Sequence, residues 1–129
     1  MKKIFYSLLF AVALTACGPA ENSQTQSLKG NNFEAVMDGV TITMSFDPEK
    51  NFAYGAVANR FNAPYEINGN QITFINPITT MMMPFGAAAD VEHHFFRFIT
   101  EIRTFDFDGE ILTFKDDAGN EMTFHKVDE

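Results

Sequence analysis

The sequence predicts an α+β domain: a curled antiparallel β-sheet, barrel-like, with one amphipathic helix inserted between two groups of strands. Apolar and hydroxyl side chains alternate over residues 40–46, which is the period of a half-buried strand. Turn pairs of Asp or Asn followed by Gly recur at 38–39, 68–69 and 108–109. Residues 84–99 instead have helical spacing. Because exposed sheet edges are a hazard, we expect the strands to curl toward a barrel, with the helix packed on it or plugging one end.

The N-terminus has the features of an export signal. Met1-Lys2-Lys3 forms a positive start, residues 4–14 are apolar, and Thr15-Ala16 are small residues of the kind that precede signal-peptidase cleavage. A transmembrane helix is the alternative, but it needs about 20 apolar residues, and this run ends at Cys17. We therefore expect residues 1–16 to be a signal peptide and Cys17 to begin the mature protein.

The stretch Leu14-Thr15-Ala16-Cys17 resembles the lipobox of bacterial lipoproteins. The resemblance implies a diacylglyceryl thioether and an acylated amino group on Cys17, and two or three fatty chains such as palmitate hold a protein stably in a bilayer. Gly18 stands where an aspartate would favour retention in the inner membrane. The resemblance therefore implies a protein that is lipid-anchored in the outer membrane, on the periplasmic face.

Residues 17–29 are expected to be the lipidated cysteine and a flexible polar linker, since residues 21–27 are polar and have no apolar period. Residues 30–128 then form one domain, a size that suits a single core. Cys17 is the only cysteine, so this domain has no disulfide.

Without the signal peptide the chain has seven basic and 17 acidic side chains, a net charge of −10. Nucleic acid is disfavoured as a partner, because phosphate binding needs clustered Lys and Arg.

Strands are predicted in consecutive pairs. Residues 33–37 pair with residues 40–46 across Asp38-Gly39, where glycine tolerates the positive φ of a tight turn. The same pattern predicts three further connections, the last of them through an acidic turn at 116–120. They join 65–67 to 72–74, 104–107 to 111–114, and 111–114 to 122–125.

The helix is predicted between these groups, with Pro84 near its first turn. Its polar side holds Glu92, His93 and Arg97, and its apolar stripe is formed by Val91, Phe95, Phe98, Ile99 and Ile102. Of the 15 phenylalanines, all but Phe5 and Phe10 lie in the mature chain, and there is no tryptophan. These residues predict one densely filled aromatic core.

Two blocks of sequence carry a family resemblance. The first block, residues 55–65, reads Gly-Ala-Val-Ala-Asn-Arg-Phe-Asn-Ala-Pro-Tyr, and the second, residues 78–84, reads Ile-Thr-Thr-Met-Met-Met-Pro. Two further features follow them: Glu92 on the predicted helix and the predicted last turn at residues 117–120. In this order and spacing they resemble the META domain family, to which the heat-inducible lipoprotein HslJ belongs. The resemblance covers nearly the whole mature domain.

The chain departs from the family at two positions. Ala58 and Met83 stand where the family has a pair of cysteines. The resemblance implies that these positions lie close together, so we expect an apolar contact between Ala58 and Met83 in place of a disulfide, with the loss of a constraint that is usually worth about 2 to 4 kcal/mol.

Three groups of side chains are candidates for metal chemistry. Met81-Met82-Met83 offers thioethers that suit Cu(I), but successive strand residues point to opposite faces. His93-His94 do not share a helix face. The acidic group lacks the EF-hand register, although weak calcium binding stays open; it comprises Asp106, Asp108, Asp116 and Asp117. We expect no resident metal, no cofactor and, since no nucleophile and base stand together, no enzymatic activity.

One polar group remains, formed by Asn59, Arg60 and Asn62, and it serves either as loop architecture or as a binding loop. The META resemblance implies a monomeric lipoprotein whose surface contacts an envelope protein, in envelope maintenance or in tolerance of heat or antibiotic stress. The alternative is a carrier of a small apolar ligand or a metal that uses the mouth of the barrel.

Overall fold

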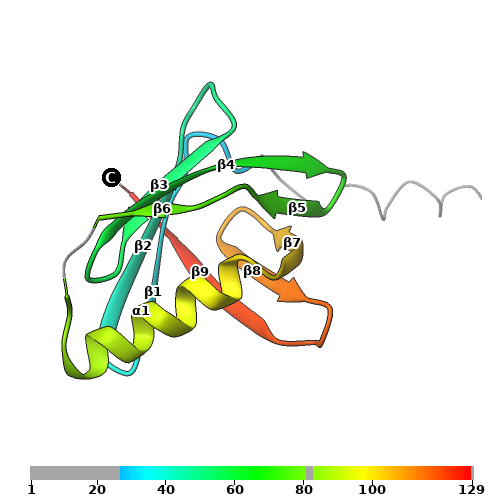
Figure 1. The fold of residues 1–129 in the computed structure, drawn as a ribbon. Coiled ribbons are helices and arrows are strands. Elements are labelled where there is room, and N and C mark those ends of the chain that lie inside the picture. Colours follow the sequence, from blue (N-terminus) through cyan, green and yellow to red (C-terminus); the bar gives the residue numbers. More distant parts are fainter. Residues whose placement is uncertain (1–26, 81–82, 129) are drawn as a thin grey trace, which may run out of the picture.

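The computed structural model describes residues 27–80 and 83–128 (Figure 1). They form one helix and nine strands in this part of the chain. In chain order these are β1 (Asn32–Met37), β2 (Val40–Phe46), β3 (Phe52–Ala56), β4 (Arg60–Asn68), β5 (Gln71–Phe74), β6 (Ile78–Thr79), α1 (Gly86–Ile99), β7 (Ile102–Phe107), β8 (Ile111–Asp116) and β9 (Glu121–Val127).

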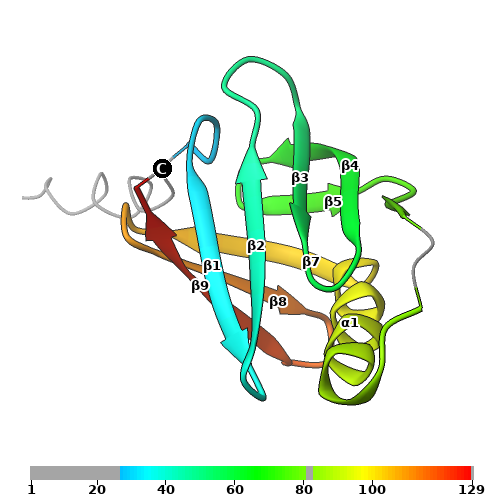
Figure 2. The ribbon, with the colours of Figure 1, turned by 90° about the vertical axis from the view of Figure 1, so that its left-hand side faces the viewer.

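The strands form one antiparallel sheet that closes on itself. Their order is β3-β2-β1-β9-β8-β7-β5-β4-β6, and an additional pairing between β3 and β4 turns the sheet into a barrel (Figure 2). Eight of the described strands, β1–β5 and β7–β9, form the closed barrel, and the two-residue strand β6 pairs with β4 outside it. Closure removes the edges that β3 and β4 would have in an open sheet, and such edges make a sheet prone to aggregation. The predicted fold class is confirmed, including the single helix between two groups of strands.

The weakest seam of the barrel lies between β5 and β7. One residue pair, Gln71 with Thr104, joins these strands, and the backbone N–H of Phe105 donates to the Asn70 carbonyl at 2.9 Å. Helix α1 runs between the side of the barrel formed by β4 and β6 and the side formed by β7 and β8 (Figure 1). Phe95 on α1 lies 5.2 Å from the ring of Phe61 and 6.5 Å from the ring of Phe124, so the helix bridges the two groups of strands.

The core is filled by aromatic side chains. Phe33 and Phe107 meet edge to face at 5.2 Å, and Phe114 and Phe124 do so at 5.9 Å, a geometry that the ring quadrupoles favour. These rings come from β1, β9, β8 and β7, four neighbouring strands of the barrel, and each is almost fully buried. The predicted aromatic core is therefore confirmed.

The predicted hairpins are present, with differences at two turns. Asp38 and Gly39 both have positive φ, 52° and 78°, and join Met37 to Val40 as expected. In the second hairpin Asn68 already pairs with Gln71, so the turn residues are Gly69 and Asn70 rather than Asn68 and Gly69.

The third turn is longer than a two-residue loop. It holds three residues, 108–110, between β7 and β8. Asp108 accepts hydrogen bonds from the backbone N–H groups of Glu110 and Ile111, both at 2.8 Å, which stabilises the longer turn.

Strands β3 and β6 and the first half of β4 are not predicted by the sequence pattern. Residues 52–56 include Ala53, Gly55 and Ala56, which have low strand propensity. Packing explains the glycine, because a Cβ atom at position 55 would lie 1.9 Å from the Thr43 carbonyl oxygen. The close approach of β2 and β3 therefore requires glycine here.

The domain begins slightly earlier than predicted. The polar linker was expected to continue to residue 29, but Leu28 is buried in the core and the Gly30 N–H donates to the Phe46 carbonyl at 2.8 Å. Cys17 and residues 1–16, which are expected to be a signal peptide, lie outside the described residues. No helix in the described part of the chain is long and apolar enough to cross a membrane.

Candidate functional site

Glu92 on α1 is the acceptor of a buried hydrogen-bond group. Its side chain is 9% exposed. Oε1 accepts from the backbone N–H groups of Ala58 at 3.0 Å and Asn59 at 2.6 Å, and Oε2 accepts from the Asn59 side-chain amide at 2.6 Å. The sequence predicted Glu92 on the polar side of the helix, and this was wrong, because the carboxylate turns inward to satisfy the turn between β3 and β4.

Asn59 and Thr80 extend this group to a third element. The Thr80 hydroxyl donates to Asn59 Oδ1 at 2.8 Å and accepts from the Arg60 backbone N–H at 3.2 Å. The Thr80 N–H donates to the Arg60 carbonyl at 3.0 Å. We call Asn59, Thr80 and Glu92 the clasp, since it ties the β3–β4 turn, the end of β6 and the helix together.

The clasp is built for stability rather than for chemistry. Hydrogen bonds to an ionised carboxylate are about twice as strong as neutral ones, and both Glu92 oxygens are engaged. Asn59 is 3% exposed, so a ligand has no access to its amide. The sequence left open whether Asn59, Arg60 and Asn62 serve as loop architecture or as a binding loop, and the hydrogen bonds and burial of Asn59 make it architectural.

Arg60 and Asn62 are not in a loop but on β4. Cross-strand partners share a face of the sheet, and Asn62 pairs with Tyr54 on one side and Ile78 on the other. Arg60 lies two residues from Asn62, so it projects from the same outer face, and it is exposed. We call Tyr54, Arg60, Asn62 and Ile78 the outer β4 face.

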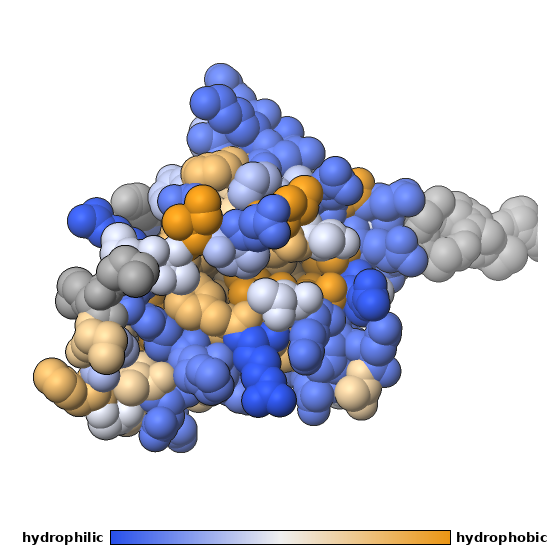
Figure 3. Space-filling view, in the orientation of Figure 1, coloured by the Kyte–Doolittle hydropathy of each residue, from blue (hydrophilic) through white to orange (hydrophobic). Residues whose placement is uncertain are grey.

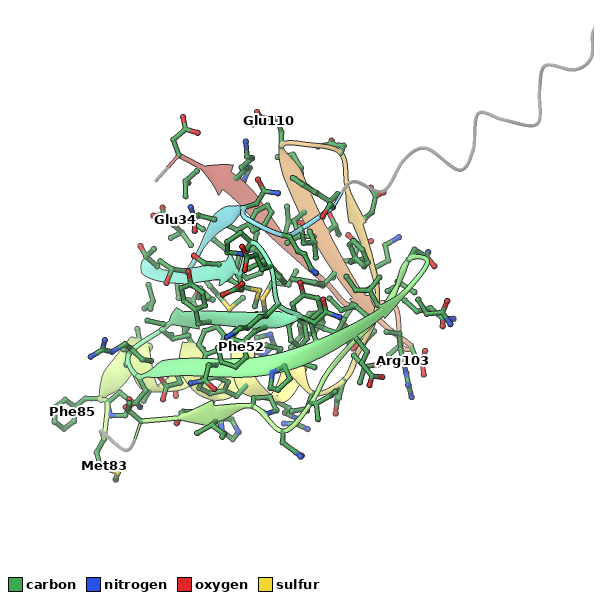
Figure 4. All side chains as sticks on the ribbon, turned by 90° about the horizontal axis from the view of Figure 1, so that it is seen from above. Glu34, Phe52, Met83, Phe85, Arg103 and Glu110 are labelled. Carbon is green, nitrogen blue, oxygen red and sulfur yellow. The ribbon has the colours of Figure 1, made fainter. Side chains whose placement is uncertain are left out.

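Two exposed apolar side chains lie on the connection from β6 to α1. Met83 is 83% exposed and Phe85 is 86% exposed, and both point away from the barrel (Figure 4). The contact expected between Ala58 and Met83 is therefore wrong, because the methionine side chain is in solvent. Apolar residues are also visible over the region of β4, β5 and β6 in the space-filling view (Figure 3).

A shallow cleft of about 290 Å³ lies at the other end of β4. Leu28, Ile67, Gly69 and Phe105 are among its lining residues. Tyr65 also lines it, and its buried hydroxyl has no hydrogen-bond partner in the described structure. Burial raises the pKa of Tyr65, and the carboxylate of Asp47 adds to that effect.

The acidic residues do not form one cluster. Ile102 pairs with Asp116 and Phe107 pairs with Leu112, so the turns after β7 and β8 lie at opposite ends of their hairpin. Asp116 accepts from the backbone N–H groups of Ala118 and Asn120 and from the Asn120 side chain, and these bonds lower its pKa. Within residues 27–80 and 83–128, no group of three or more His, Cys, Asp or Glu side chains could hold a metal ion.

Comparisons with known proteins place the fold in a family. An NMR structure of a protein from Burkholderia xenovorans superposes with a TM-score of 0.69 and 18% identity, over 98% of this chain and 100% of that one. A second NMR structure gives a TM-score of 0.61 and 18% identity, over 76% of this chain and 90% of that one. No curated protein matches the chain. The family model of the META domain matches residues 19–129, and the chain belongs to the META domain family.

Proposed function

We propose that this protein is a lipid-anchored, non-enzymatic docking module on the periplasmic face of the outer membrane, and that it serves envelope maintenance or stress tolerance by binding an envelope protein. The contact region is the outer β4 face together with Met83 and Phe85, which we call the docking surface. The lipobox at Leu14 to Cys17 supports the anchor.

The exposure of Met83 and Phe85 carries this proposal. Large apolar side chains that stand in water next to each other on one connection are costly unless a partner covers them. Phenylalanine, tyrosine, methionine and arginine are also enriched at protein interfaces, and the outer β4 face supplies Tyr54 and Arg60 beside Ile78.

The position of the docking surface favours a protein partner over the anchoring leaflet. Leu28, where the chain enters the domain, lines a cleft with Ile67 and Gly69 at the C-terminal end of β4, whereas β6 pairs with Phe61 and Asn62 near its N-terminal end. A nine-residue strand spans about 26 Å. Leu28, where the described chain enters the domain, and the docking surface thus lie toward opposite ends of the domain.

The filled interior supports a surface role. The side chains of Phe33, Phe46, Phe107 and Phe124 are almost fully buried inside the barrel. An eight-stranded barrel whose side chains fill the interior leaves no chamber for a ligand. Binding then falls to the outer surface, and the clasp serves to hold β6 and α1 in place beneath the docking surface.

Site-specific photocrosslinking in intact envelopes tests the proposal. The full-length protein carries p-benzoyl-phenylalanine in place of Phe85, and the matched control carries it in place of Val36, which is 69% exposed on β1. We expect a discrete protein adduct from position 85 and none of the same mass from position 36. The absence of an adduct at 85, or equal adducts at both positions, would contradict docking through this surface.

A carrier of small apolar ligands is the second candidate, and the cleft beside Tyr65 favours it. The lining is partly apolar, through Leu28, Ile67 and Phe105, and the unpartnered Tyr65 hydroxyl offers one polar contact. An apolar dye that binds the purified protein, is displaced by an envelope lipid extract and fails to bind Ile67→Ser would support the carrier. If the wild type does not bind the dye, the carrier function is contradicted.

A further inference from the structure

We infer that Met83 is an oxidation site that switches the docking surface off: a two-electron oxidant converts its thioether to a sulfoxide and so weakens partner binding. The inference rests on the proposed docking function and adds its regulation.

The methionines of the described chain differ sharply in access to solvent. Met83 is 83% exposed, whereas Met44 is fully buried and Met122 is 5% exposed. Oxidation of a thioether requires that the oxidant reach the sulfur, so exposure sets the order of reaction. Among the described residues, Met83 is the highly exposed methionine, Met37 is partly buried, and Met44 and Met122 are shielded references with the same chemistry.

The reaction balances with hypochlorous acid as the oxidant. The Met83 sulfur gains an oxygen atom and loses two electrons, the O–Cl bond breaks, and one proton and one chloride ion leave. The reaction uses no other group of the protein. Methionine sulfoxide reductases reverse it, so the change qualifies as a switch rather than as damage.

The location of Met83 makes the change consequential. Met83 lies two residues before Phe85 and just before α1, within the most exposed apolar part of the docking surface. A flexible thioether adapts well to an apolar partner surface. A sulfoxide oxygen has no partner in such a contact, and burying an unpaired polar group weakens binding about ten-fold or more.

The first test maps the order of oxidation. The folded protein is treated with substoichiometric hypochlorous acid, and the sulfoxide at each methionine is quantified by peptide mass spectrometry. We expect Met83 to react at least about ten-fold faster than Met44 and Met122, because both references are shielded. Oxidation of Met83 no faster than Met44 would overturn the inference.

The second test links oxidation to docking. Envelopes that carry the photocrosslinker at position 85 are treated with hypochlorous acid, with Met83→Leu as the matched variant, which keeps an apolar side chain that cannot form a sulfoxide. We compare each protein with its own untreated sample. We expect oxidation to lower the wild-type adduct about ten-fold, to leave the Met83→Leu adduct at its own untreated level whatever that level is, and we expect methionine sulfoxide reductases to restore the wild-type adduct. If oxidation lowers the adduct equally in the wild type and in Met83→Leu, the switch is contradicted and the docking function is not. If the untreated wild type gives no adduct, docking is contradicted, and the proposed switch is contradicted too.

Discussion

Glu92 is the residue on which the position of the helix most depends. Its carboxylate receives three N–H donors from the turn between β3 and β4, and two of them are backbone groups whose bonds to Glu92 would be lost without the carboxylate. We expect Glu92→Ala to lower the free energy of unfolding by about 3 kcal/mol, since a buried hydrogen bond to a charged group is worth about 1.5 to 3 kcal/mol and the donors are left unpaired.

Asp90→Ala is the matched control for Glu92→Ala. Asp90 is acidic, lies on the same helix and is exposed, so its removal should change the free energy by less than about 0.5 kcal/mol. Urea denaturation of both variants, followed by circular dichroism, makes the comparison. If the two variants were equally stable, the clasp would have no structural role.

Gly55 is a second residue with a definite physical requirement. A Cβ atom there would overlap the Thr43 carbonyl oxygen at 1.9 Å, and a backbone atom of a paired strand cannot move away cheaply. Gly55→Ala should therefore cost more than about 3 kcal/mol or prevent folding. Tyr54→Ala, at an exposed neighbouring position, serves as the control. A Gly55→Ala protein with an unchanged melting temperature would show that β2 and β3 do not approach this closely.

At the scale of elements, three aspartates stabilise turns in the same way. Asp47, Asp108 and Asp116 each accept backbone N–H bonds from residues two to four positions later. These bonds hold the pKa of Asp47 and of Asp108 below the ordinary value of 3.8, and at Asp116 the Asn120 side-chain amide is the largest cause of the lowered pKa, to which the backbone bonds add. A carboxyl group with a lowered folded-state pKa stabilises the protein above its unfolded pKa and loses that contribution as the pH falls through the folded value.

The pH dependence of unfolding follows from these turns. We expect the melting temperature to be level above about pH 5 and to fall progressively below pH 3.8. Asp116→Ala should lower the melting temperature above about pH 5. It should also make the fall of the melting temperature in acid less steep, because one of the three titrating carboxylates is gone. Circular dichroism melts between pH 2 and pH 7 measure both effects. An acid decline of unchanged steepness in Asp116→Ala would contradict this account of the turn.

Local signals explain what the sequence could predict about these elements. Pairs such as Asp38-Gly39 encode a turn by themselves, so the hairpins were predicted and are present. β3 has no such signal, because Ala53 and Gly55 are chosen by close packing rather than by propensity. Val91, Phe95, Phe98 and Ile99 form the buried stripe of the helix as predicted, but Ile102 was wrongly included, because the helix ends at Ile99 and Ile102 begins β7. The helix also begins at Gly86, two residues after Pro84.

The candidate site was less accessible to sequence reasoning, because its contacts are distant along the chain. Asn59 and Glu92 are 33 residues apart, and helical periodicity placed Glu92 on the polar side. The family resemblance singled out both residues and the segment that contains Thr80, which was the available signal. Only the three-dimensional structure shows that Asn59 forms hydrogen bonds with both Glu92 and Thr80. The same closure of the barrel placed Arg60 and Asn62 on an outward face instead of in a loop.

At the scale of the whole molecule, we assign different roles to two opposite ends of the folded domain. The chain enters the domain beside Leu28 at one end of β4, and the docking surface lies toward the other end. If Cys17 carries the lipid anchor, the wild type should fractionate with membranes and take up labelled palmitate, while Cys17→Ser should do neither. Membrane-bound Cys17→Ser, or an unlabelled wild type, would contradict the anchor.

The central claim is that the protein acts through its docking surface, and complementation of a deletion strain tests it most directly. The strain is profiled against envelope-active antibiotics while it expresses the wild type, the double variant Met83→Ser/Phe85→Ser, or the control Val36→Ser, all at equal level in the membrane fraction. We expect the wild type and Val36→Ser to restore tolerance and the double variant to fail although it melts at the wild-type temperature, since both changed side chains are exposed. Full restoration by the double variant would contradict the account.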